Sequence, residues 1–213
     1  MKKPSSILIF VVLAFLLPAA AYAIVNWYEQ TFTALPVFGK EEVVNGKTMP
    51  HRIDSFKLTN QDAVTKQLGD WDGKILVADF FFTHCPSICP RLTANLKRVQ
   101  EAYNHDDDVA ILSFSVDPER DSSMALQKYA QRFSINTRQW QLLTGSKQAI
   151  YKLARNSFEI VATDGDGGPD DFIHSEKLVL VDRQRRIRGY YDGTDDTAIK
   201  NLIRDIKKLQ HEE

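Results

Sequence analysis

The stretch KILVADFFF, residues 74 to 82, constrains the fold most, because it is a nearly continuous apolar run rich in β-branched and aromatic residues. A strand that is buried on both faces has this pattern, whereas a strand with one solvated face alternates between apolar and polar residues. The run VAILSFSV, residues 109 to 116, has the same character. We therefore expect two central strands of a sheet that is covered on both sides, which is typical of α/β proteins.

The remaining pattern alternates between helices and strands. Leu92, Leu96, Val99 and Tyr103 recur at helical spacing, and the run 177–182 forms a predicted hairpin with 186–192. This hairpin adds an antiparallel pair, so the α/β sheet is predicted to be mixed. Further elements are expected as strands at 54–60 and 139–145, and as helices at 126–133, at 146–157 after a Ser146 cap, and from Asp195 or Asp196 onward.

The N-terminus carries a separate signal. Lys2 and Lys3 precede an apolar run from Ile7 to Val25. This run predicts that residues 1–28 are a transmembrane anchor or signal segment, with the N-terminus in the cytoplasm. Ala21-Tyr22-Ala23 resembles a cleavage site, but the length of the run favours a retained anchor.

The location follows from this segment. We expect a single-pass protein of the cytoplasmic (inner) membrane, with residues 29–50 as a tether or an edge hairpin and 51–210 as a domain facing the periplasm or another extracytoplasmic space. Thiols in such an oxidising compartment need a reductant to stay reduced. The formal net charge of -1 and the absence of a basic stripe exclude nucleic acid as an expected partner.

The chain's two cysteines lie in FFTHCPSICP, residues 81 to 90, directly after the first predicted central strand. That position places Cys85 and Cys89 at the carboxyl edge of the sheet, where α/β folds gather reactive groups. Cys89 opens the following helix, whose N-terminus favours thiolate over thiol. We therefore expect accessible thiols of low pKa. A purely structural disulfide is disfavoured, because so short a loop removes less entropy than the ~3 kcal/mol of a 15-residue loop.

A redox pair and a metal site both fit two such thiols, and a third ligand would separate them. His174 is the candidate, because it follows a glycine-rich loop and directly precedes the strand KLVLVD. His51 and His105 lie in polar segments and are expected at the surface. Two thiolates with an imidazole suit Cu(I) or Zn(II). Copper is favoured, since a closed zinc site needs a fourth ligand.

Three blocks in order, FFTHCPSICP, SFSVDPERDS and FIHSEKLVLVD, resemble the Sco/SenC family across residues 52 to 208. Its members are membrane-anchored copper chaperones of thioredoxin-like, three-layer fold that serve cytochrome c oxidase assembly. The resemblance implies a copper ion held by Cys85, Cys89 and His174, with the segment Asp117 to Glu119 near the site. It also implies a copper-accepting oxidase subunit with a binuclear copper centre, and a thiol reductant, as partners.

The expected function is therefore that of a membrane-tethered copper metallochaperone, a carrier more than an enzyme. Its thiols would hold copper when reduced and form a disulfide when oxidised, and the resemblance adds reduction of the acceptor's cysteines as a second role. The main alternative is a thiol-disulfide oxidoreductase of the same fold. A peroxiredoxin-like peroxidase and a redox-sensing interaction module are further alternatives.

Overall fold

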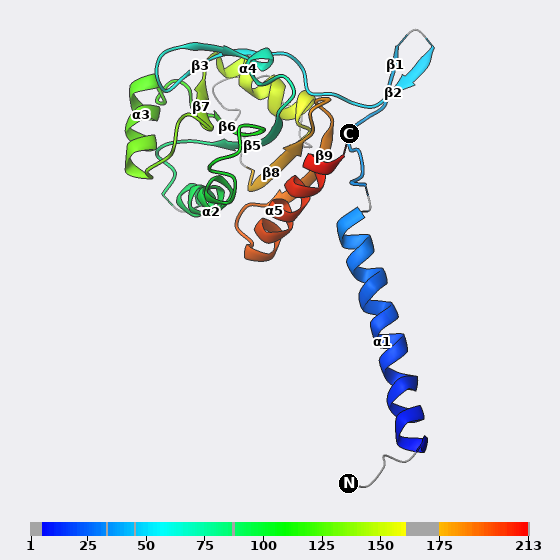
Figure 1. Cartoon of the computed structure of the whole chain (residues 1–213). Coiled ribbons are helices and arrows are strands. Elements are labelled where there is room, and N and C mark those ends of the chain that lie inside the picture. The colour runs from blue at the N-terminus through cyan, green and yellow to red at the C-terminus, as the bar shows by residue number, and fades with distance from the viewer. Residues whose placement is uncertain (1–5, 33, 45, 87, 161–174, 213) are drawn as a thin grey trace. The chain divides into compact units, whose positions relative to one another are not determined.

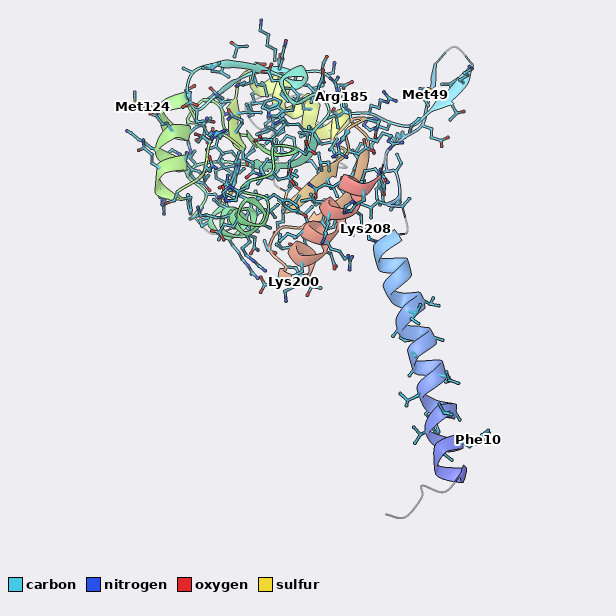
Figure 2. All side chains as sticks on the ribbon, in the orientation of Figure 1. Phe10, Met49, Met124, Arg185, Lys200 and Lys208 are labelled. Atoms are coloured by element: carbon cyan, nitrogen blue, oxygen red, sulfur yellow. The ribbon has the colours of Figure 1, made fainter. Side chains whose placement is uncertain are left out.

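The structure is a computed structural model that describes residues 6–32, 34–44, 46–86, 88–160 and 175–212. The chain divides into two compact units, Met1–Ala34 and Leu35–Glu213. The first unit contains one long helix, α1 (Ser6–Phe32), with exposed apolar side chains such as Phe10 (Figures 1 and 2). Within the described residues, no helix is long and apolar enough to cross a membrane. The membrane segment expected from the sequence stays a prediction.

The second unit is built on a sheet in which seven described strands follow the order β4-β3-β7-β6-β5-β8-β9. The three central strands are parallel, and the strands on either side of them run antiparallel, which confirms the predicted mixed sheet. The strands are β3 (Lys57–Asn60), β4 (Thr65–Gln67), β5 (Ile75–Phe81), β6 (Val109–Ser115), β7 (Trp140–Thr144), β8 (Lys177–Val181) and β9 (Ile187–Asp192).

Helices cover both faces of this sheet, as the sequence predicted. One face packs against α2 (Ile88–Ala102), α3 (Ser123–Arg132) and α5 (Asp196–His211), and the other against α4 (Lys147–Lys152) and the π-helical turn Leu153–Ser157 that continues it. Figure 1 shows α4 on the opposite side of the sheet from α2 and α5. The domain is therefore a three-layer α/β/α sandwich.

The central strands are buried throughout, and this holds for every residue of β5 and β6. Successive side chains of a strand point to opposite faces. In β5, Ile75, Val77 and Phe81 accordingly pack with the α2 layer, while Leu76 packs with the α4 layer. By the same alternation, the Asp79 side chain lies on the α2 face of the sheet, close enough to Cys89 to influence its pKa.

Helix starts agree with the expected capping residues. The Ser146 hydroxyl accepts a hydrogen bond from the Ala149 amide at 3.2 Å, and the Asp195 carboxylate accepts two from the first turn of α5. Such caps satisfy amides that have no partner within the helix. The helix predicted over 146–157 ends as an α-helix at Lys152 and continues as the π-helical turn.

The segment before the sheet contains a hairpin, which was one of the two alternatives expected from the sequence. The strands β1 (Glu42–Val44) and β2 (Lys47–Met49) form a small hairpin, and the Phe38 amide donates to the carbonyl of Ile187 at 2.9 Å. The expectation that His51 lies at the surface was wrong. Its ring is buried, and its Nε2 lies 2.8 Å from the carbonyl oxygen of Ser157.

Candidate metal centre

The two cysteines lie where the central strand β5 gives way to α2. After β5 the chain makes a tight turn, closed by a 3.3 Å hydrogen bond from the Cys85 amide to the Phe82 carbonyl. The helix then begins at Ile88, so Cys89 belongs to its first turn. The Cys89 amide donates to Cys85 Sγ at 3.3 Å. The structure thus brings Cys85 and Cys89 together at the carboxyl edge of the parallel strands, as predicted.

Both cysteines are buried, with Cys85 8% and Cys89 3% exposed. Burial, together with smaller contributions from the nearby Cys85 and Asp79, raises the pKa of the Cys89 thiol to about 12. The expectation of accessible thiols with low pKa was therefore wrong. A helix N-terminus stabilises a negative charge by only ~1 kcal/mol, whereas loss of water around a buried thiolate shifts a pKa by several units.

A buried acid, Asp79, lies in the same layer as the cysteines. Burial raises the pKa of its carboxyl from 3.8 to about 7, although a hydrogen bond from the Ser113 hydroxyl lowers it in part. The Trp140 indole donates to the same hydroxyl at 2.7 Å. The interpretation of residues 74–82 as an apolar run does not account for Asp79. A single acidic residue inside a strand buried on both faces was the available signal.

A second buried acid, Asp121, ties the cysteine turn to the loop that follows β6. Its fully buried carboxylate accepts hydrogen bonds from the Thr83 amide at 3.1 Å, from the Thr83 hydroxyl at 2.5 Å and from the Ser115 hydroxyl at 2.6 Å. The segment Asp117 to Glu119, expected near the site from the resemblance, lies in the same loop. The Asp121 amide donates to the Asp117 carbonyl at 2.9 Å.

His174, the third predicted ligand, lies outside the described residues. Those residues resume at Ser175, just before β8 begins at Lys177. Because β8 pairs antiparallel with β5, with Ala78 opposite Val179, β8 begins at the edge where β5 ends. Among the described residues, no set of three or more His, Cys, Asp or Glu side chains converges on a metal position. The described part of the centre therefore consists of two adjacent soft sulfur donors.

Comparison with known proteins identifies the family of this chain. The profile of the SCO1/SenC family matches residues 45–211. The chain belongs to the SCO1/SenC family. It is 33% identical over 159 residues to the SCO1 protein homolog of Bacillus subtilis, covering 74% of this chain and 82% of that protein. It spans a smaller share, 56%, of the mitochondrial SCO2 homolog of Danio rerio, to which it is 32% identical.

Solved structures of SCO1/SenC relatives share the fold. BsSco, described as a member of the Sco family of cytochrome c oxidase assembly proteins with a disulfide switch, is 32% identical with a TM-score of 0.65, over 76% of this chain and 95% of that one. Bradyrhizobium japonicum ScoI with copper bound is 26% identical with a TM-score of 0.59, over 74% and 99% of the two chains. These likenesses confirm the expected thioredoxin-like fold.

Proposed function

We propose that this SCO1/SenC protein is a copper metallochaperone whose cargo is held by Cys85, Cys89 and His174. The observation that carries the proposal is the pairing of two buried cysteines at one strand-to-helix junction, with the Cys89 amide 3.3 Å from Cys85 Sγ. Relatives described with copper bound and as oxidase assembly proteins support it. The acceptor is then an oxidase subunit that contains a binuclear copper centre.

The donor set fits copper. Thiolate sulfur is a soft ligand that selects Cu(I), and the apolar packing around both cysteines keeps competing water away from the ion. Each thiol must release its proton when it binds, so copper binding is coupled to proton release. Since burial raises the pKa of Cys89 to about 12, that thiol stays protonated until a metal ion takes the proton's place.

His174 is the proposed third ligand because of its place in the chain. It directly precedes Ser175, and the chain enters β8 at Lys177, at the sheet edge where Cys85 and Cys89 lie. A nitrogen ligand added to two sulfurs gives three-coordination, which leaves room for an acceptor's ligand during transfer. Dissociation of the histidine is then the first step of release, and the two sulfurs leave the ion afterwards.

We also propose that the protein is held at the cytoplasmic membrane by its N-terminal segment. The support is the apolar run from Ile7 to Val25 behind Lys2 and Lys3. This arrangement puts the copper centre in the periplasm or an equivalent extracytoplasmic space, where a partner reductant maintains the thiols. Vesicles labelled on one side with a protease or a thiol reagent test this orientation.

A thiol-disulfide oxidoreductase is the second candidate, favoured by the adjacency of the two sulfurs and by the disulfide switch described for BsSco. The raised pKa of Cys89 weighs against it, because thiolate is the attacking species in disulfide exchange. The same two thiols can nevertheless form a disulfide, which would prevent copper binding until a reductant acts.

One experiment separates the two candidates. The reduced full-length protein is exposed to copper, and its metal content and visible absorption are compared with those of the Cys85→Ser/Cys89→Ser variant. The carrier proposal expects one copper per chain, absent from the double variant. It also expects that His174→Ala loses copper affinity by about 10- to 100-fold while exchanging disulfides at the wild-type rate. A protein that exchanges disulfides rapidly and retains no copper would reverse the assignment.

A further inference from the structure

The turn before the first cysteine carries a chain of hydrogen bonds from the interior to the surface. Thr83 and His84 occupy the two corner positions of the turn between Phe82 and Cys85. The Thr83 hydroxyl donates to Asp121 Oδ1 at 2.5 Å, and Thr83 Oγ1 lies 2.9 Å from His84 Nδ1. Asp121 is fully buried, whereas the His84 side chain is 63% exposed. The chain therefore ends in an imidazole that faces solvent.

These contacts determine the tautomer of the neutral His84 ring. A hydroxyl has a single hydrogen, and that of Thr83 is directed to the Asp121 carboxylate. The Thr83 oxygen can then only accept from the ring, so His84 Nδ1 carries the hydrogen. The lone pair of a neutral imidazole must in consequence lie on Nε2. Carboxylates orient metal-binding histidines in proteins in this way, by fixing the tautomer through the other nitrogen.

A purely structural histidine would be arranged differently, as His51 shows in the same domain. The His51 ring is buried, and its Nε2 contacts the Ser157 carbonyl oxygen at 2.8 Å. At His84 the contact to the protein interior is made through Nδ1, and the side chain is largely exposed directly before the 8% exposed Cys85. The turn thus presents an oriented nitrogen donor at the surface, next to sulfur donors that are covered.

We propose that His84 is an outer copper ligand, which receives the ion from its carrier and passes it to Cys85 and Cys89. This inference rests on the proposed copper function and adds the route that the ion follows. In the first step a bond from copper to the carrier breaks as the bond to His84 Nε2 forms, and no proton is lost from the ring. The two cysteine sulfurs then displace Nε2, and each thiol releases one proton to water. The oxidation state of copper does not change.

The test measures the rate at which the reduced full-length protein takes up Cu(I) from the Cu(I)–bicinchoninate complex. The visible absorption of that complex disappears as the ion is transferred to the protein. His84→Leu removes the nitrogen donor, whereas His84→Met replaces it with a thioether that also binds Cu(I). We expect about tenfold slower uptake for His84→Leu, with one copper bound at the end point, and a largely restored rate for His84→Met. The exposed His105 provides a control, and His105→Ala should load at the wild-type rate.

Thr83 tests the hydrogen-bond chain itself. Thr83→Val removes the hydroxyl that orients the ring and should slow uptake, while Thr83→Ser keeps the hydroxyl and should restore the rate. The inference is overturned if His84→Leu loads as fast as wild type, or if His84→Leu and His84→Met are slowed equally. A wild-type protein that takes up no copper would remove the proposed function as well, which distinguishes the two failures.

Discussion

Substitution of Asp79 by asparagine should make the protein more stable at neutral pH. Burial raises the pKa of this carboxyl from 3.8 to about 7, because the ionised form loses its water in the interior. Asparagine has nearly the same shape, cannot ionise, and can still accept the hydrogen bond from Ser113. The substitution therefore isolates the effect of the charge from that of packing.

The sign and size of the effect follow from proton linkage. Between about pH 4 and pH 7 the native protein keeps a proton on Asp79 that the unfolded chain has released, so wild-type stability falls as the pH rises through this window. Above about pH 7 both states are ionised, and the loss is complete. A displacement of about three pKa units corresponds to about 4 kcal/mol. Asp79→Asn cannot ionise at this position, so above about pH 7 its free energy of unfolding should exceed that of the wild type by about 4 kcal/mol.

Urea denaturation of the reduced protein in the presence of a chelator, at intervals from pH 4.5 to 8, measures the difference. Titrations of all other groups largely cancel between the two proteins, so the difference reports on Asp79. It should grow with pH and level off above about pH 7. A difference in unfolding free energy that stays constant across this range would show that Asp79 ionises as it does in the unfolded chain.

Two further stability predictions come from the packing. The Arg188 side chain, 3% exposed, donates to the buried Asp182 at 3.0 Å. Arg188→Met should therefore lower the free energy of unfolding, measured by urea denaturation, by about 3 kcal/mol. Arg98→Met, which removes an exposed ion pair, should lower it by less than about 1 kcal/mol. Equal costs would contradict the distinction. Phe158 is fully buried, and its ring centroid lies 5.4 Å from that of Phe114. Phe158→Ala should lower the free energy of unfolding by about 3–5 kcal/mol. A loss under about 1 kcal/mol would show that Phe158 is not packed in the core.

Sequence patterns predicted the elements that have strong periodicity. The apolar runs 74–82 and 109–116 contain β5 and β6, which are buried on both faces. The helical spacing from Leu92 to Tyr103 coincides with α2. Two features without a periodic pattern were not predicted. The three-residue strand β4 and the contact of Phe38 with β9 have no periodic signal, because they depend on partners far away in the sequence.

For the candidate site, the sequence predicted that Cys85 and Cys89 lie together at the sheet edge, but it did not predict their surroundings. The position of Cys85 and Cys89 follows from the end of a buried strand, which the sequence reveals. Their burial and the raised pKa of Cys89 depend on how α2 packs, and that packing is not encoded locally. The same holds for Asp121, whose buried carboxylate is satisfied by hydrogen bonds from the Thr83 turn 38 residues earlier.

X-ray absorption at the copper edge of the copper-loaded, reduced full-length protein shows directly which atoms hold the ion. We expect two sulfur atoms and one imidazole nitrogen. We also expect that Cys85→Ser/Cys89→Ser removes the sulfur signal and that His174→Ala removes the nitrogen signal. Copper held only by nitrogen and oxygen atoms in the wild-type protein, or a spectrum unchanged in the cysteine variant, would refute binding by Cys85, Cys89 and His174.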